Sequence, residues 1–180
     1  PGGKTTHLGE LMNNDGGILA CDRNEARLKL VARTADRLGL SLISCRPGDS
    51  RGLEAAVPAA DVVLLDAPCT GSGTLARRPD LRWRLNAERL AELLPLQREL
   101  LQTAAALTRP GGVLVYATCS LEPEENEQQM AWFDGNYAEF GPEAPPSAVP
   151  PGWDSARAWA TIRPEADHDG FFVARRRRKS

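Results

Sequence analysis

Short apolar runs that end in polar residues recur along this chain. Runs at 18–22 (ILACD), 40–45 (LSLISC), 61–68 (DVVLLDAP) and 112–119 (GVLVYATC) predict four strands. The run at 61–68 is nearly all apolar, which is typical of a strand covered on both faces. These runs supply the strands of a buried sheet.

Helical patterns separate the predicted strands. Residues 24–38 carry apolar side chains at helical spacing, and Gly39 follows as a stop signal. A long helix is predicted over 86–107, with Asn86 as its N-cap and a kink or break at Pro95. Alternation of strand and helix predicts an α/β fold with a mostly parallel sheet and crossover helices.

The remaining segments complete this plan. Residues 109–112 predict a turn, and 123–125 suit the first turn of a helix. Residues 141–152 predict a Pro-rich loop. The segments 156–162 and 171–177 predict a closing antiparallel pair.

A short Gly turn at the amino end (PGGKT, residues 1–5) opens a predicted helix. Such a turn works by presenting backbone N–H groups at the end of a strand. No strand precedes it in this sequence. We therefore expect a Rossmann-like sheet that lacks its first, central strand. The turn is not a P-loop, because that pattern is absent, and an ordinary tight turn is the alternative to a cofactor loop.

Composition narrows the class of protein. The chain has 180 residues and a net charge of −2, as expected for one globular domain. No apolar stretch reaches the roughly 20 residues of a membrane span, and the amino end does not read as a signal peptide. Four cysteines without a C-x-x-C pair argue against zinc and favour a reduced, cytoplasmic protein.

Two of the cysteines follow predicted strands. Cys69 lies in Asp66-Ala67-Pro68-Cys69, and Cys119 lies in Ala117-Thr118-Cys119-Ser120. In open α/β sheets this edge is where ligands bind. Two cysteines that face one crevice indicate a reaction with two sulfur-dependent steps. A predicted helix start near Cys119 is expected to lower the pKa of its thiol. The alternative is a pair of inert buried cysteines.

Acidic residues follow the other two predicted strands. Asp22 comes about 20 residues after the Gly turn, where an acid can accept hydrogen bonds from ribose hydroxyls. Asp49 follows the next strand and suits the edge of an adenine ring. The alternatives are a helix cap for Asp22 and a turn residue for Asp49.

Basic residues cluster in two places. The first cluster spans 77–89 and has Trp83 embedded in it, which suits phosphate contacts and base stacking. An exposed amphipathic segment explains it equally well. The second cluster, Arg175–Lys179, is expected to be a disordered basic tail. His7 and His168 are expected at the surface, and the acidic residues at 122–127 are expected on a solvated helix start rather than in a metal site.

The motifs together resemble the RNA cytosine-5 methyltransferases, and most closely the bacterial Sun/Fmu 16S ribosomal RNA enzymes. The resemblance rests on PGGKT, LLDAPCTGSGTLARRPDLRW, RPGGVLVYATCSLEPEEN and DGFFVAR, and it runs from residue 1 to about 176. It implies a class I methyltransferase domain over residues 1–180, truncated at its amino end and without the RNA-binding domain of the family. Only the second half of the family's first motif is present.

The resemblance also assigns roles. S-adenosylmethionine is the implied methyl donor, and ribosomal RNA is the implied partner of a monomeric, metal-free enzyme. Cys119 is implied as the nucleophile and Cys69 as the cysteine that releases the product, with Asp66 between cofactor and target base. The expected catalytic residues are Cys119, Cys69, Asp66 and Lys4. The expected cofactor-binding residues are Pro1, Gly2, Gly3, Lys4, Asp22, Arg27, Asp49 and Asp66. The expected RNA-binding residues are Arg77, Arg78, Arg82 and Trp83.

Two other functions remain open on the sequence. A DNA cytosine-5 methyltransferase would use the Pro-Cys cysteine, Cys69, as its nucleophile, and the Thr-Cys at 118–119 argues against this. A catalytically inactive RNA-binding or assembly module is the alternative from a different class.

Overall fold

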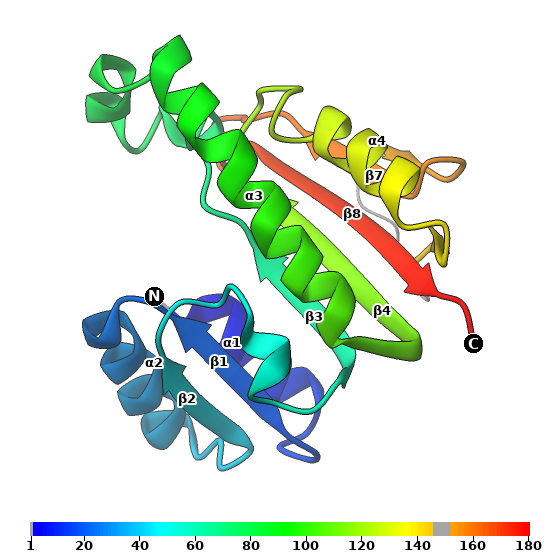
Figure 1. Ribbon diagram of the computed structural model, residues 1–180. Coiled ribbons are helices and arrows are strands. Elements are labelled where there is room, and N and C mark those ends of the chain that lie inside the picture. The colour runs from blue at the N-terminus through cyan, green and yellow to red at the C-terminus, as the bar shows by residue number, and fades with distance from the viewer. Residues whose placement is uncertain (1, 146–151) are drawn as a thin grey trace. The chain divides into compact units, whose positions relative to one another are not determined.

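The computed structural model describes residues 2–145 and 152–180 (Figure 1). The helices are α1 (Gly3–Leu11), α2 (Glu25–Leu38), α3 (Ala87–Leu107) and α4 (Glu127–Asn136), with short 3-10 helices η1 (Leu53–Ala55), η2 (Ser72–Thr74) and η3 (Pro79–Trp83). The strands are β1 (Ile18–Asp22), β2 (Ile43–Pro47), β3 (Ala60–Asp66), β4 (Thr108–Thr118), β5 (Phe140–Pro142), β6 (Trp153–Asp154), β7 (Trp159–Ile162) and β8 (Phe171–Arg178). The chain divides into two compact units, with the boundary between Leu53 and Glu54.

The first unit is built on two parallel strands. β1 pairs with β2 in a register that places Asp22 opposite Pro47. Helix α2 packs on this pair through the buried face of Leu28, Val31 and Ala35. Parallel pairing brings the carboxyl ends of β1 and β2 to one edge of the sheet.

The second unit contains a larger sheet with the strand order β3-β4-β8-β7-β6, and β5 lies beside β8. β3 and β4 are parallel, whereas β8 runs antiparallel to β4, β5 and β7. Helix α3 lies along β3 and β4 (Figure 1). Fully buried side chains fill the core beneath it, among them Leu101, Leu114, Met130, Phe133 and Phe172.

The α/β class, the helix over 24–38 and the closing antiparallel pair are confirmed. The strand predicted over 40–45 is shifted, because β2 begins at Ile43. Gly39 ends α2 with φ at 69°, and the Leu40 N–H then donates to the Ala35 carbonyl, 2.9 Å away. Leu40 therefore belongs to the C-terminal cap of α2, where its side chain is buried, and not to β2.

Three other boundaries differ from the predictions. α3 is one helix with Pro95 inside it, so of the predicted kink or break, the break is wrong. β4 begins at Thr108, so the segment predicted as a turn over 109–112 belongs to the strand. α4 begins only at Glu127, so the predicted first turn at 123–125 is too early. The Pro-rich loop falls partly on residues 146–151, which lie outside the described residues.

The predicted disordered basic tail is wrong. Residues through Arg178 form β8, whose side chains alternate between buried and more exposed positions. Arg176 shares the buried face with Phe172 and Ala174. Its guanidinium pairs with Asp134 at 2.6 Å and donates to the Arg157 carbonyl at 2.9 Å, which satisfies a cation that burial alone would make costly. No helix of the described residues is long and apolar enough to span a membrane.

Candidate active site

The ends of β3 and β4 bring the two predicted cysteines together. The parallel register places Asp66 opposite Ala117, and the Ala67 N–H donates to the Ala117 carbonyl, 2.9 Å away. Each strand therefore passes its cysteine into a turn at the same edge. The sulfur atoms of Cys69 and Cys119 lie 3.4 Å apart, within hydrogen-bond distance. Two thiols at this separation can act on one small ring.

The surroundings of the pair act on the pKa of Cys69. The hydrogen bond with Cys119, burial, and the negative charge of Glu125 all raise the pKa of Cys69. Cys69 therefore keeps its proton at neutral pH and can donate it toward Cys119. A thiol that donates to a neighbouring sulfur stabilises negative charge there. Either sulfur atom can donate in this hydrogen bond, so the two thiols form one coupled pair.

The prediction that a helix start near Cys119 lowers the pKa of its thiol is wrong. Helix α4 begins at Glu127, so Cys119 is not at a helix start. It lies in the turn that follows β4, where its carbonyl accepts from the Gly73 N–H at 3.0 Å. The structure therefore places no helix N-terminus at Cys119.

Asp66 is the last residue of β3 and is exposed. It lies at the same strand edge as the two thiols, three positions before Cys69 in the sequence. A carboxylate at this edge can accept hydrogen bonds from a polar ring that lies over the sulfur atoms. A pocket of about 260 Å³ lies next to the turn that follows Cys69. It is lined by Thr70, Leu85, Asn86, Ala87, Leu90 and Glu122.

Glu125 and Asn126 are both fully buried next to this edge. The Glu125 carboxylate accepts from the Thr70 N–H at 2.9 Å, from the Thr70 hydroxyl at 2.5 Å and from the Gln97 amide at 2.9 Å. Asn126 accepts from the Thr118 hydroxyl at 2.6 Å. The prediction that the acidic residues at 122–127 lie on a solvated helix start is therefore wrong for Glu125.

The first unit gathers the acidic candidates at the carboxyl ends of β1 and β2. Asp22 ends β1 and accepts from the Asn24 N–H at 2.8 Å, and Arg27 approaches its carboxylate at 3.8 Å. Asp49 follows β2, and its contact with Arg51 lowers the pKa of its carboxyl to about 2. Asn24, rather than Asp22, caps helix α2. Asp22 and Asp49 therefore lie at one edge, as the strand-end argument predicts.

The Gly turn opens α1. Gly2 has φ at 93°, and a side chain there would meet Val31 at 3.0 Å, so both backbone and space favour glycine. Gly3 and Lys4 begin the helix, and Lys4 is exposed. Pro1 lies outside the described residues. The turn thus presents a helix N-terminus, the arrangement that suits a close backbone approach to a ligand.

The predicted RNA-binding residues are exposed around η3. Trp83 has 85% of its surface exposed. Arg78 and Arg82 are exposed too, and the ion pairs of the described residues include neither. Arg77 differs, because its guanidinium pairs with Asp169. All four candidates are thus exposed to solvent, and one of them, Arg77, is also paired with a carboxylate.

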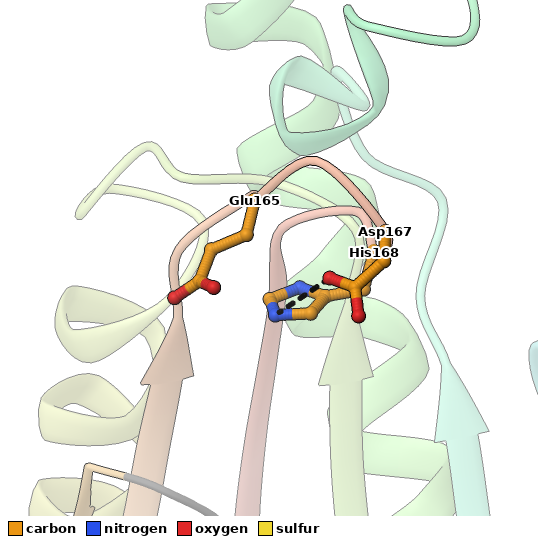
Figure 2. A group of neighbouring side chains, drawn as sticks. All are labelled: Glu165, Asp167 and His168. Atoms are coloured by element: carbon orange, nitrogen blue, oxygen red, sulfur yellow. Dashed lines mark ion pairs between the residues drawn. The ribbon is translucent and has the colours of Figure 1, made fainter.

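The histidines are exposed, as predicted. His7 lies 3.7 Å from Glu10. His168 groups with Glu165 and Asp167 in the connection between β7 and β8, and Figure 2 shows the Asp167 carboxylate beside the His168 ring. All three side chains are exposed, and no second feature of the described residues indicates that they hold a metal.

Comparison with known proteins decides the family. A family model described as 16S rRNA methyltransferase RsmB/F matches residues 1–177. The chain belongs to the RsmB/F family. This confirms the resemblance to the bacterial 16S ribosomal RNA enzymes that the sequence motifs indicate.

Individual members of the RsmB/F family and solved structures agree with this. The probable ribosomal RNA small subunit methyltransferase B of Synechocystis is 45% identical over 179 residues, which is 97% of this chain and 40% of the relative. The ribosomal RNA small subunit methyltransferase F of Escherichia coli K12 is 38% identical over 183 residues, or 99% of this chain and 38% of the relative. The structure of NSun6 from Pyrococcus horikoshii with SFG has a TM-score of 0.87 and 32% identity, and covers 100% of this chain and 46% of that one.

The chain therefore spans about two fifths of the length of the curated RsmB/F relatives it matches. The Rossmann-like α/β fold of the methyltransferases is confirmed by these structural matches. Sequence reasoning missed the buried contacts of Glu125 and Asn126. Both lie in the EEN run that forms part of the family resemblance, and the run's position just after the Cys119 strand is the signal that could have found them.

Proposed function

We propose that this chain is the catalytic part of an enzyme that methylates C5 of a cytosine in ribosomal RNA, with 16S RNA as the substrate. The observation that carries the proposal is the pair of sulfur atoms, 3.4 Å apart at the ends of two parallel strands. Membership of the RsmB/F family and the names of its relatives support the RNA and the methyl transfer. The cysteine pair supports the choice of the cytosine C5 atom.

The chemistry needs a nucleophile because cytosine C5 is itself a poor one. The Cys119 thiolate adds to C6, which forms a carbon–sulfur bond and makes C5 carbanion-like. C5 then gains the methyl group, the C5 proton passes to water or a neighbouring base, and the electron pair of the broken C5–H bond restores the ring double bond and expels the Cys119 thiolate. Cys69, which touches Cys119 and holds a proton, is placed to assist this release. The target base must leave its stack to reach the strand edge.

Asp66 has a separate role in the proposal. Its carboxylate hydrogen-bonds the amino or N3 edge of the ring and favours the build-up of charge there.

The covalent step is the direct test of the whole proposal. A cysteine-dependent RNA–protein adduct and a 5-methylcytidine product are expected in 16S RNA, and methylation of any other atom contradicts the proposal.

S-adenosylmethionine fits the first unit and supplies the methyl group when bound. SFG, a S-adenosylmethionine analogue, accompanies a structural neighbour at 32% identity. The Gly2–Gly3 turn offers a close backbone approach, and Asp22 and Asp49 lie at the carboxyl edge of β1 and β2. Asp22 is assigned to the ribose and Asp49 to the adenine. The expected Lys4 and Arg27 contacts belong to the same proposal.

Replacing Asp22 by alanine is expected to weaken binding of S-adenosylmethionine more than binding of RNA. A hydrogen bond to a charged group contributes about 1.5–3 kcal/mol, which corresponds to a loss of roughly 10- to 150-fold. Calorimetry measures the change. Asp36→Ala, on the exposed surface of α2, is the matched control. An unchanged affinity would leave Asp22 as a residue that only supports the Asn24 turn.

Trp83 and its neighbouring arginines form the proposed RNA-contact surface. An indole ring that is 85% exposed offers a stacking face for an unpaired base. Trp83→Ala is expected to weaken RNA binding by roughly 5- to 150-fold, because stacking contributes about 1–3 kcal/mol per base. Trp83→Phe keeps an aromatic face and should retain most of the affinity. Equal losses in the two variants, measured by fluorescence anisotropy, would rule out stacking.

A further inference from the structure

The two residues that flank Cys69 are both tied to one buried pair of side chains. Thr70 donates its N–H and its hydroxyl to the Glu125 carboxylate. Pro68 accepts at its carbonyl from the Gln97 amide, 2.9 Å away, and the same amide donates to Glu125. The backbone on each side of Cys69 is therefore fixed by hydrogen bonds that converge on Glu125.

The two residues that flank Cys119 are tied in the same manner to Asn126. Its amide oxygen accepts from the Thr118 hydroxyl at 2.6 Å, and its amide nitrogen donates to the Ser120 carbonyl at 2.9 Å. The Ser120 hydroxyl lies 3.1 Å from the Thr70 hydroxyl, which links the two sets of contacts. Consecutive residues of the chain thus hold the two cysteine turns.

Burying the Glu125 carboxylate costs desolvation free energy, which its hydrogen bonds must offset. Its side chain is fully buried, and the ion pairs of the described part of the chain do not include it. A buried carboxylate that has only neutral donors gains less than one that has a cation, so packing alone does not explain the choice of residue. The donors that it does have are those of the turn around Cys69.

We propose that Glu125 and Asn126 are the positioning residues of the two thiols: Glu125 holds the Cys69 turn, Asn126 holds the Cys119 turn, and together they set the separation of the sulfur atoms. The catalytic consequence rests on the proposed function. Release of the product, assigned to Cys69, then depends on Glu125. Attack on the base, assigned to Cys119, then depends on Asn126.

Thiol reactivity tests the positioning without any RNA. Glu125→Gln keeps the shape of the side chain but removes its charge and sets an amide N–H₂ against the present donors. Iodoacetamide labelling, followed for each cysteine by mass spectrometry, is expected to show Cys69 reacting roughly 3- to 10-fold faster, because the turn that holds it loosens and a negative charge that raises its pKa is removed. Cys21 and Cys45, in the first unit, serve as internal references and should stay within about twofold.

Glu124→Gln is the matched control, since it makes the same chemical change one residue earlier at a partly exposed site. It should leave all four labelling rates unchanged. A Cys69 rate that stays within about twofold in Glu125→Gln overturns the proposal. So does a parallel rise at all four cysteines, because that reports general loosening of the fold rather than a local hold on one turn.

Kinetics of the full-length protein with 16S RNA separate the two arms. Glu125→Gln is expected to lower kcat about tenfold, with KM for RNA within twofold, and to let the RNA–protein adduct persist. Asn126→Asp keeps the acceptor for Thr118 but opposes the Ser120 carbonyl, and it should slow formation of the adduct about tenfold. If both variants show identical adduct kinetics, the assignment of Glu125 to product release and Asn126 to attack on the base is overturned. If neither the unsubstituted protein nor Cys69→Ala forms an adduct, the proposed function fails, and the labelling rates still decide the positioning.

Discussion

Alanine in place of Cys69 is expected to leave RNA covalently attached to the protein, whereas alanine in place of Cys119 is expected to prevent any attachment. The sulfur atoms are 3.4 Å apart, and the raised pKa of Cys69 keeps its proton in place. Without Cys119 no thiolate can add to C6. Without Cys69 the attack and the methyl transfer proceed, but the adduct resolves slowly.

Denaturing gels with labelled RNA and S-adenosylmethionine measure this in the full-length protein. A slowly migrating band is expected for Cys69→Ala and none for Cys119→Ala, and turnover should fall by at least about 100-fold in both, the scale of one lost catalytic group. Cys45→Ala, in the first unit, is the control and should behave like the unsubstituted enzyme. The opposite pattern would make Cys69 the nucleophile, as in a DNA-type mechanism. Full activity without adduct in both variants would leave the two cysteines as buried core residues.

Gly73→Ala is expected to slow methyl transfer by roughly 100-fold and to destabilise the fold. A Cβ at this position would lie 2.7 Å from the Gly170 carbonyl oxygen and 2.9 Å from the Cys119 carbonyl oxygen. Both contacts are with backbone, which cannot rotate away, and the Gly73 N–H itself donates to Cys119. The added methyl must therefore push the turn that carries Cys119, or the Gly170 backbone, away from η2. Overpacking of this kind costs about 1–3 kcal/mol in stability, and displacement of a reacting group by about 1 Å can cost roughly 100-fold in rate.

Thermal unfolding and single-turnover methyl transfer measure the two effects of Gly73→Ala. Gly135→Ala is the matched control, because it adds the same methyl group to the exposed side of α4, where nothing lies within 4 Å. That variant should be neutral or slightly stabilised, since alanine is the better helix former. Normal activity in Gly73→Ala would show that the turn around Cys119 tolerates displacement.

The positions of the strand-end residues could be predicted from sequence because they follow from a local rule. An apolar run that ends in a polar turn delivers that turn to the carboxyl edge of a parallel sheet, and this holds for Asp22, Asp66, Cys69 and Cys119. The pairing of β3 with β4 then brings the two cysteines together. Assignment of chemistry to them also drew on the family resemblance, which local patterns alone do not supply.

The errors concern residues whose state depends on distant partners. Arg176 reads as part of a charged tail, yet Asp134 and backbone carbonyls bury it within a strand. Glu125 reads as a solvated helix start, yet Thr70 and Gln97, distant in sequence, supply its hydrogen bonds. Pro95 predicts a kink or a break, yet α3 continues through it as one helix, packed along β3 and β4. Tertiary contacts override the local preference in each case.

The short connection from Cys119 to Asn126 has a consequence for sequence evolution. Asn126 bonds to residues on both sides of Cys119, and Glu125 bonds to the neighbouring turn. Inserting or deleting one residue at 121–124 would move both side chains out of reach of their partners. Substitution of an exposed side chain in this segment, such as that of Pro123, would leave Glu125 and Asn126 in reach of their partners. We therefore expect related sequences to differ in residue type at 121–124 but to keep the same number of residues between Cys119 and Glu125.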